Sequence, residues 1–468
     1  MSMTTPIVDF VRSYAKSGTS RLHMPGHKGQ KLLGFEDADI TEIKGADELY
    51  EAEGIIAESE ANATKLFGTA HTYYSTEGSS QCIRAMLCLA LQAAPAGQRP
   101  VLLAARNAHK ALLYAAALLD FDIEWLWPAP EAAGALCSCP VTAGQLEQAL
   151  ERLSGQGRTP FGVYVTSPDY LGGMQDIAAL SKVCDAHGAP LLVDNAHGAY
   201  LNFLVGGSKH PMALGAAMCC DSGHKTLPVL TGGAYLHLGP SVQADEAAVR
   251  NALALFGSTS PSYLILQSLD AANARLAGDF REKLALCRWR LGMLCRELDA
   301  FRPGLALPLT GAHREPLKLT LDAAVLGLSG QQLAQALREQ GVECEYADPR
   351  YLVLMPSPES SAEDFARLQK ALHALCAEAS SAAPASDGDA AAFAALAEAL
   401  QAQPRPAAIR EAVLAPQEMV PAAEAVGRIC AAPAVSCPPA VPIVVSGEVI
   451  PAQALPLFAR YGIGRVAV

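Results

Sequence analysis

Between residues 60 and 240, short apolar runs alternate with longer stretches in which apolar residues recur at helical spacing. Six apolar runs have the length and composition of buried strands, and they cover residues 100–106, 123–128, 161–168, 190–196, 216–222 and 232–238. Between them, stretches such as residues 175–188 carry apolar residues three and four positions apart, which is typical of an amphipathic helix. Gly188 and Pro190 would end that helix before the next strand. This alternation predicts an α/β fold with a mainly parallel sheet that is covered by helices on both faces.

The pattern changes after about residue 265. Residues 266–298 form a long helical run, and two further strands are predicted in PLKLTLDA (316–323) and YLVLMPSP (351–358). Residues 380–410 are rich in Ala, Pro and Ser, a composition that fits either a flexible linker or an Ala-rich helix. We therefore expect an N-terminal arm and helix, a large domain, a connecting helix with a small α/β domain, the linker or helix, and a C-terminal region. Their expected bounds are 1–55, 56–275, 276–379, 380–410 and 411–468.

Composition narrows the classes of protein that remain. The chain has 468 residues, of which 51% are hydrophobic and 18% charged, so it can bury a large core. We expect no membrane association, because no apolar run reaches the roughly 18 residues that span a bilayer and the first residues resemble an amphipathic helix. A net charge of −12 argues against a nucleic-acid partner.

The 13 cysteines are irregularly spaced and mostly lie in apolar stretches, which favours a reducing cytoplasm over a secreted disulfide framework. Two close pairs, Cys137 with Cys139 and Cys219 with Cys220, could suggest a metal site. Neither pair has a second half at ligand spacing, so we expect no metal.

Two polar clusters, DNAHG (194–198) and DSGHKT (221–226), follow predicted strands. Ligands of parallel α/β sheets bind beyond the carboxyl ends of the strands, where these clusters would lie. An arbitrary lysine is usually solvated, but a partly desolvated Lys225 could form a Schiff base with pyridoxal phosphate (PLP). Asp194 could hold the pyridine nitrogen of PLP protonated, although alone it would be read as a turn cap. His197 could orient Asp194 or contact the cofactor, or it could be structural.

A candidate phosphate cradle lies where a predicted strand leads into Gly78, Ser79 and Ser80 and a helix begins. Free backbone N–H groups at a helix N-terminus, together with two hydroxyl groups, can bind an anion. Taken alone, the two serines would be ordinary helix caps. His109, in RNAHKA (106–111), follows another strand and could stack on the cofactor ring. Together, these four signals predict one PLP site.

With these motifs the chain resembles the ornithine/lysine/arginine decarboxylases, PLP enzymes of the aspartate-aminotransferase fold (fold type I). The resemblance extends over most of the chain. It is carried by RLHMPGHKG (21–29), DITEIKGADELYEAEGII (39–56), STEGSSQ (75–81), RNAHKA, TSPDYLGG (166–173), DNAHGAY (194–200), DSGHKTLPVLTGGAYLH (221–237), FGSTSPSYLILQSLDAAN (256–273) and the stretches at 341–357 and 425–450. Only 22 residues precede HMPGHKG, so the chain resembles the short form of the family.

The resemblance implies a role for each matched residue. It implies Lys225 as the cofactor-bound lysine, Asp194 as the partner of the ring nitrogen and His109 as the stacking group. It implies contacts to the phosphate or the rest of the cofactor from Gly78, Ser79, Ser80, His197, Ser222 and His224. Thr259 would reach the phosphate of a neighbouring subunit, and Glu345 would bind the cationic end of the substrate, with Glu343 and Asp348 close by in the sequence.

The implied reaction is PLP-dependent decarboxylation of a basic amino acid in polyamine metabolism. Arginine, giving agmatine and CO₂, is favoured over lysine and ornithine, and Lys225 or His224 would return a proton to the substrate carbon. The resemblance also implies a cytoplasmic homodimer or larger homo-oligomer with shared active sites.

Three positions depart from residues that are common in the family: Asp169, Asn195 and the pair Gly232–Gly233. They lie near the expected site and leave the substrate less certain than the cofactor. One alternative is another fold type I reaction such as transamination, in which Arg350 or Arg428 would bind the substrate α-carboxylate. A second alternative is a non-catalytic regulator, but such proteins carry a basic DNA-binding domain for which this chain has neither room nor charge.

Overall fold

The computed structural model describes residues 3–94, 96–128, 137–311, 313–378, 388–403, 405–436 and 441–468. The chain divides into two compact units, the first built from residues 1–94 and 184–282 and the second from residues 95–183 and 283–468. The domain bounds expected from the sequence remain predictions. None of the helices in the described ranges is long and apolar enough to cross a membrane.

The main sheet has seven strands in the order β1-β7-β6-β5-β4-β2-β3. Their bounds are β1 (His71–Ser75), β2 (Val101–Ala105), β3 (Asp122–Leu126), β4 (Gly162–Thr166), β5 (Leu191–Asp194), β6 (Met218–Asp221) and β7 (Ala234–Leu238). Strand β2 is parallel to β3 and β4, and β5 is parallel to β6. Only β7 pairs antiparallel, with β1 and with β6, among the described pairings of this sheet. The mainly parallel α/β fold and all six predicted strands are confirmed.

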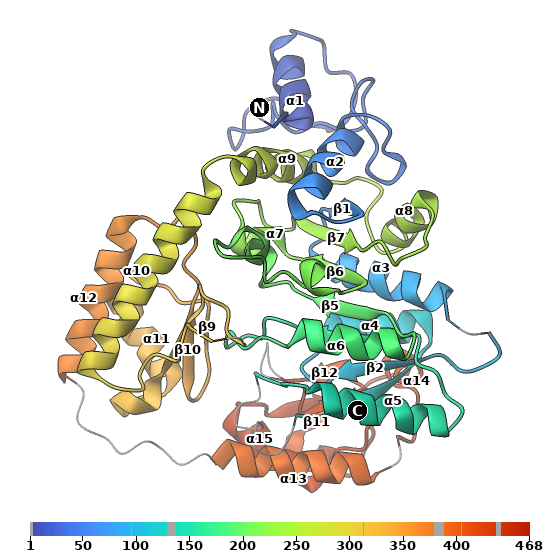
Figure 1. Cartoon of the computed structure of the whole chain (residues 1–468), viewed down its shortest axis with the longest axis vertical. Helices are drawn as coiled ribbons and strands as arrows, with labels where there is room; N and C mark the ends of the chain where they lie inside the picture. The colour runs from blue at the N-terminus through green and yellow to red at the C-terminus, as the bar shows by residue number, and fades with distance from the viewer. Residues whose placement is uncertain are drawn as a thin grey trace. The chain divides into compact units, whose positions relative to one another are not determined.

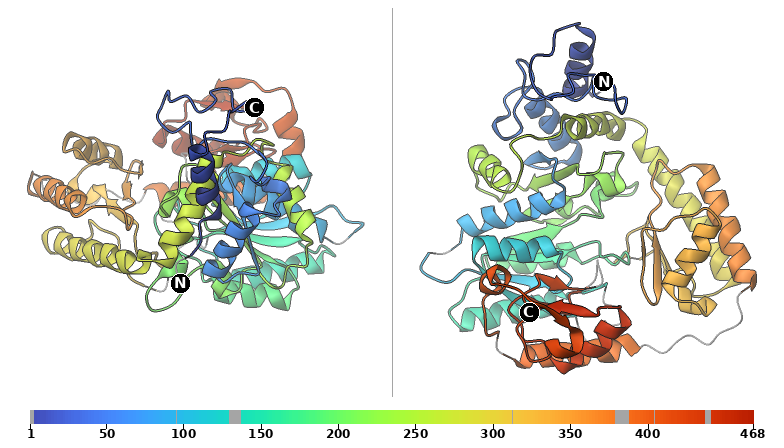
Figure 2. Two further views of the ribbon diagram at one scale, coloured as in Figure 1. Left: turned by 90° about the horizontal axis from the view of Figure 1, so that it is seen from above. Right: turned by 180° about the vertical axis from the view of Figure 1, so that it is seen from behind.

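The first unit places its helices around β1, β7, β6 and β5. They are α1 (Pro6–Lys16), α2 (Ile55–Phe67), α3 (Ser79–Gln92), α7 (Gly223–Thr226), α8 (Glu246–Ala254) and α9 (Tyr263–Ala277). Helix α3 is buried along most of its length and packs on β6, β7 and α8. Helices α1, α2 and α9 pack on one another (Figures 1 and 2) because α1 turns Ile7, Val8 and Val11 inward.

The helical run predicted over residues 266–298 is two helices rather than one. Helix α9 ends at Ala277, and α10 (Phe280–Phe301) begins two residues beyond Gly278. The amide of Gly278 still bonds the carbonyls of Ala274 and Arg275, but its φ of −92° and ψ of −121° turn the chain out of the helix. Apolar spacing continues across this turn, so it does not show the break.

In the second unit, α4 (Lys110–Leu119) and α5 (Ala143–Gly155) accompany β2, β3 and β4. The predicted helix at 175–188 is α6 (Ile177–Ala186), which begins in the second unit and ends in the first. A separate antiparallel sheet has the order β8-β10-β9, with bounds Leu319–Asp322, Tyr351–Leu354 and Tyr346–Ala347. Helices α10, α11 (Gly330–Glu339) and α12 (Ala362–Glu378) pack on this sheet through a shared leucine-rich core (Figure 1). The two strands predicted in this region are confirmed.

Composition left open whether residues 380–410 form a flexible linker or an Ala-rich helix, and the structure answers this for part of the segment. Residues 388–402 form helix α13 (Gly388–Ala402), whereas residues 380–387 of the expected linker or helix lie outside the described residues. The remaining elements are α14 (Ile409–Leu414), α15 (Leu455–Arg460) and the antiparallel pairs β11 (Met419–Pro421) with β14 (Arg465–Ala467) and β12 (Ala434–Val435) with β13 (Val444–Val445). Helix α13 packs on α15 (Figure 2).

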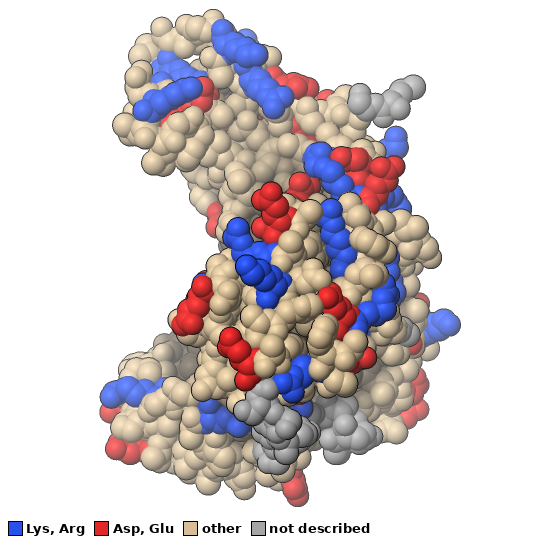
Figure 3. Space-filling view, turned by 90° about the vertical axis from the view of Figure 1, so that its left-hand side faces the viewer, with Lys and Arg blue, Asp and Glu red and all other residues tan. Residues whose placement is uncertain are grey.

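Short 3₁₀ helices complete the description: η1 (Leu49–Glu51), η3 (Ala199–Phe203), η4 (Pro211–Leu214), η5 (Ala323–Leu326), η6 (Ala422–Ala425) and η7 (Ala452–Ala454). On the face drawn in Figure 3, lysine and arginine side chains are interspersed with aspartate and glutamate side chains. This face therefore presents charges of both signs side by side.

Candidate active site

Lys225 lies one helical turn beyond the end of β6. The four-residue helix α7 begins directly after this strand, and the backbone N–H of Lys225 donates to the carbonyl of Ser222 at 3.2 Å. The half-buried Lys225 side chain ends with Nζ 3.1 Å from Nε2 of His197. The two polar clusters noticed in the sequence are therefore joined by a direct contact.

Asp194 is the last residue of β5, the parallel neighbour of β6. It is 3% exposed, and its Oδ1 accepts from the backbone N–H of Ala196 at 3.1 Å. Asp194 therefore does cap the turn that follows β5, as the structural interpretation of this residue expected. This hydrogen bond also fixes the direction of a buried carboxylate three residues before His197, which contacts Lys225.

A fully buried polar network lies at the ends of the same two strands. Asp221 accepts from Asn195 Nδ2 at 2.7 Å, from His210 Nε2 at 2.9 Å and from His237 Nε2 at 3.2 Å. Burial alone would raise the pKa of Asp221, but the two histidines outweigh it and hold that pKa well below its usual range. Burial lowers the pKa of His237.

This network gives a physical reason for Asn195, one of the departures from the family pattern. An amide at position 195 donates to the ionised Asp221, whereas a carboxylate there would repel it in a buried setting. Gly198 follows from the same arrangement, because a Cβ at this position would overlap the amide oxygen of Asn195. His210 and His237 are members that the sequence did not reveal, since neither stands in a recognisable motif.

His210, Cys219 and Asp221 also meet the spacing of a metal site, with possible ligand atoms all within 4.8 Å of one another. The hydrogen bonds of Asp221 to His210 and His237 already give its carboxylate a structural role. The expectation that the protein holds no metal stays a prediction.

The candidate phosphate cradle is the N-terminus of α3. Gly78 takes the N-cap position with a φ of 72°, which favours glycine, and neither serine caps the helix through its side chain. Instead, the buried Ser222 donates from Oγ to Oγ of Ser79 at 2.8 Å, while Ser80 is half-buried in the first turn. The contact joins the α3 N-terminus to the chain just before Lys225.

Gly232 and Gly233, another departure, connect these two loops. The carbonyl of Gly232 accepts from the N–H of Gly78 at 2.7 Å, and the carbonyl of Gly233 accepts from the N–H of His224 at 3.1 Å. Nδ1 of His224 also lies 3.1 Å from the same oxygen. A Cβ at Gly232 would lie 2.8 Å from the carbonyl oxygen of Thr76, so close packing explains the glycine.

The remaining candidate residues belong to other elements of the fold. Thr259 belongs to the first unit and is exposed between α8 and α9, and His109 is the exposed N-cap of α4 in the second unit, where its Nδ1 accepts from the N–H of Ala111 at 3.2 Å. Glu345 is also in the second unit, exposed just before β9, and accepts from the hydroxyl of Tyr170 at 2.6 Å.

The neighbours of Glu345 have other partners. Glu343 pairs with Arg338 at 2.8 Å, and the buried Asp348 accepts from the backbone N–H groups of Arg350 and Tyr351 at 2.7 and 2.6 Å. Each of the three acids therefore has a partner within the second unit, and the assignment of Glu345 to the substrate stays a prediction.

Asp169, the third departure, organises a buried turn. Its carboxylate accepts from the N–H groups of Leu171 and Gly173 at 2.9 and 2.7 Å and from Oγ of Ser138 at 2.6 Å. Burial raises the pKa of Asp169. Lys318, which the sequence did not single out, is fully buried and donates to the carbonyl of Asp169 at 2.9 Å.

If the protein were a transaminase, Arg350 or Arg428 would bind the substrate α-carboxylate, but both are paired with carboxylates of the protein. Arg350 contacts Oδ2 of Asp322 from Nη2 and Nε at 2.8 and 3.0 Å. Arg428 pairs with Glu418 at 3.1 Å. Neither pairing favours a role in binding a substrate carboxylate.

The mainly parallel α/β fold is that of the fold type I class of PLP enzymes. Solved structures agree with this fold. A lysine decarboxylase of Francisella novicida aligns with 99% of this chain and 79% of its own, with a TM-score of 0.79 and 17% identity. The constitutive lysine decarboxylase of Escherichia coli aligns with 99% of this chain and 80% of its own, with a TM-score of 0.76 and 18% identity.

Residues 5–289 match the major domain of the Orn/Lys/Arg decarboxylases, and residues 389–461 match their C-terminal domain. The chain belongs to the Orn/Lys/Arg decarboxylase family, as its resemblance predicted. Among curated relatives, an uncharacterized Bacillus subtilis protein, YaaO, is 31% identical over 75% of this chain and 74% of its own. An arginine decarboxylase of Bacillus subtilis is 27% identical over 95% of this chain and 91% of its own.

Proposed function

We propose that the protein binds PLP and decarboxylates a basic amino acid, with arginine as the favoured substrate and agmatine and CO₂ as products. One observation carries the proposal: Asp194 and the His197–Lys225 contact lie together at the ends of two neighbouring parallel strands. Its support in the comparisons is that relatives named arginine decarboxylase align with most of the chain at 26–27% identity.

The donor set fits PLP group by group. Nζ of Lys225 would bond the aldehyde carbon, the Asp194 carboxylate would hold the ring nitrogen protonated, and His109 would stack on the ring. The N-terminus of α3 with Ser79, Ser80 and Ser222 would hold the phosphate. When bound, PLP supplies the electron sink for the bond to the substrate carboxylate.

The residues of this chain then have separate tasks. The buried Asp194 would pair with the ring nitrogen of PLP, and the N–H of Ala196 holds its carboxylate in place. His197 Nε2 lies within hydrogen-bond distance of Lys225 Nζ, so it can take up a proton from this amine and return it. Lys225 would deliver the proton to the substrate carbon, with His224 as the second candidate.

We assign recognition of the substrate side chain to Glu345 in the second unit. Glu345 is exposed and already oriented by Tyr170, so its carboxylate can pair with a guanidinium or an amine. Burial and the bond to Glu345 raise the pKa of Tyr170, which keeps this hydroxyl a donor. We further propose a cytoplasmic homodimer in which the exposed Thr259 reaches the cofactor phosphate of the partner.

The test is to supply the purified protein, loaded with PLP, with arginine, lysine and ornithine separately and to measure CO₂ and the amine formed. CO₂ and agmatine from arginine are expected. CO₂ from lysine or ornithine alone would keep the reaction and change the substrate. A keto acid without CO₂ would indicate transamination and contradict the proposal.

A further inference from the structure

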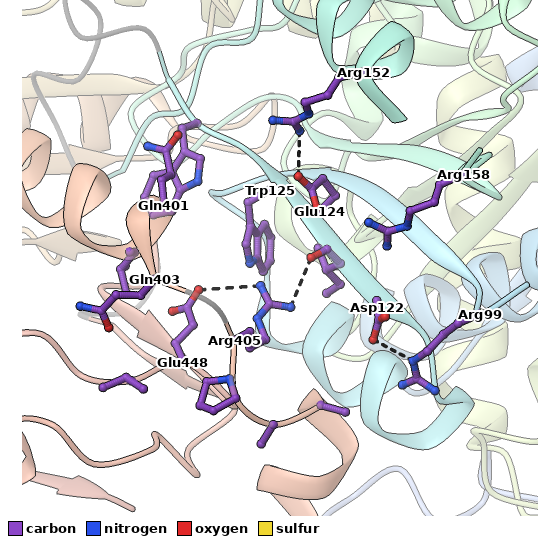
Figure 4. A pocket seen from close by; sticks show the side chains of 17 residues that line it. Arg99, Asp122, Glu124, Trp125, Arg152, Arg158, Gln401, Gln403, Arg405 and Glu448 are labelled. Carbon is purple, nitrogen blue, oxygen red and sulfur yellow. Dashed lines mark hydrogen bonds and ion pairs between the residues drawn. The ribbon is translucent and has the colours of Figure 1, made fainter. Parts of the chain in front are cut away.

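A polar pocket lies in the second unit, and none of the residues that line it belongs to the proposed PLP site. It has a volume of about 570 Å³ and is formed by β3, the loops before β2 and after α5, and the segment that follows α13 (Figure 4). We call it the Arg405 pocket. The residues that carry its charge and its aromatic wall are Arg99, Arg152, Arg158, Arg405, Glu448 and Trp125.

Four arginines and three carboxylates line the Arg405 pocket. Two of the carboxylates are paired: Arg99 contacts Asp122 at 3.0 Å, and Arg152 contacts Glu124 at 2.7 Å. Within the described ranges of the chain, the guanidinium of Arg158 makes no hydrogen bond or ion pair. Figure 4 shows its side chain extending toward the middle of the pocket.

The third carboxylate, that of Glu448, is bound by Arg106, which does not itself line the pocket. Glu448 binds the fully buried Arg106 through both oxygens, at 2.7 and 2.9 Å, and is only 3.9 Å from the guanidinium of Arg405. Arg405 also donates to the carbonyl of Ile123 at 3.2 Å, but its buried Nε has no partner among the described residues. Arg106 and Arg405 thus share the carboxylate of Glu448. Arg405 is the more distant of the two cations, so less of its charge is neutralised. Burial lowers the pKa of Arg405, as expected for a cation short of counter-charge.

The neutral groups of the pocket add to this excess of donors. Trp125 is 9% exposed, and its indole N–H is buried without a hydrogen-bond acceptor in the described part of the chain. Buried donors cost free energy unless an acceptor satisfies them. A ligand that completes this pocket must therefore bring negative charge and several acceptor atoms.

We propose that the Arg405 pocket binds a small multivalent oxyanion, carrying phosphate or carboxylate groups, that bridges Arg158 and Arg405. The planar guanidinium fork suits both groups because it donates two parallel N–H bonds to one oxyanion. Two cations from separate segments call for a ligand with more than one negative group. None of the residues that line the Arg405 pocket belongs to α3, whose N-terminus we assign to the cofactor phosphate.

The test uses the full-length protein loaded with PLP, so that the cofactor phosphate site is filled, and freed of excess PLP. The chain has three tryptophans, and Trp289→Phe leaves fluorescence from Trp125 and Trp127 alone, both of which line the pocket. In this background the protein is titrated with pyrophosphate and, separately, with citrate. We expect a saturable change in fluorescence with at least one of them.

Arg158→Gln should weaken this binding about tenfold or more, because one charge-assisted contact is lost. Arg158 lies in a surface loop, so the variant should fold. Arg296→Gln on α10 makes the same charge change at an exposed site and should leave binding unchanged. Binding of pyrophosphate alone identifies a phosphate-bearing ligand, and binding of citrate alone identifies a polycarboxylate. No binding of either at millimolar concentration, or equal binding by Arg158→Gln, would overturn the proposal.

Discussion

Glu448→Ala is predicted to destabilise the second unit strongly, because it leaves a buried cation without its counter-ion. Arg106 is 0% exposed, and Glu448 is the carboxylate that binds its guanidinium, with two hydrogen bonds of 2.7 and 2.9 Å. Breaking a buried ion pair by removing one partner costs about 3–5 kcal/mol of unfolding free energy. The indole rings of Trp125 and Trp127, 4.9 and 4.6 Å from the cation, cannot replace a carboxylate.

The loss can be measured by urea unfolding in the Trp289→Phe background, where the fluorescence comes from the two tryptophans beside Arg106. Glu418→Ala is the matched control, since it breaks an exposed pair with Arg428 and should cost at most about 1 kcal/mol. The double variant Arg106→Met with Glu448→Leu removes the buried pair and should recover part of the lost stability, because Arg405 still loses the carboxylate that it shares with Arg106. If Glu448→Ala costs no more than Glu418→Ala, or if the double variant is as unstable as the single one, the reasoning is wrong.

Three further predictions concern the first unit. Gly198→Ala should cost about 1–3 kcal/mol, since its Cβ would overlap the Asn195 amide, whereas Gly155→Ala, with open space around it, should cost nothing in a thermal unfolding comparison. Burial, opposed by an arginine, raises the pKa of Glu60 to about 7, so its contribution to stability is present below pH 4.5 and is lost as the pH rises through 7. Glu60→Gln should lack this loss when melting temperatures are compared at pH 5 and pH 8. Asp194→Asn should lower the rate of CO₂ release at least about 10²-fold with little change in melting temperature.

Each of these predictions has an outcome that contradicts it. Equal melting temperatures for the two glycine variants would remove the steric argument. Parallel pH profiles for the protein and Glu60→Gln would mean that Glu60 does not titrate in this range. Unchanged CO₂ release by Asp194→Asn would exclude this carboxylate as the partner of the ring nitrogen.

Local patterns in the sequence were enough to place Asp194 and Lys225 at strand ends. Apolar runs and helix stops are properties of neighbouring residues, so they can be read without the fold. The break at Gly278 was missed because apolar spacing continues across it. The role of Asn195 could not be predicted, since it depends on Asp221, which lies 26 residues further along the chain.

Long-range polar contacts were the least visible feature. Arg106 and Glu448 are separated by 342 residues and meet only because the C-terminal segment folds against β2 and β3 within the second unit. The sequence around Arg106 or Glu448 does not predict that the two residues form a pair. The same limit applies to the Arg405 pocket, whose charges become meaningful only once their pairing is known.

We propose that Lys225 forms the covalent bond to PLP. This bond can be tested without measuring decarboxylation. The protein is incubated with PLP, reduced with borohydride to make the linkage permanent, digested, and its peptides are weighed by mass spectrometry. We expect a pyridoxyl phosphate group on Lys225 and its loss in Lys225→Ala. A label on a different lysine, or no label at all, would contradict the proposal.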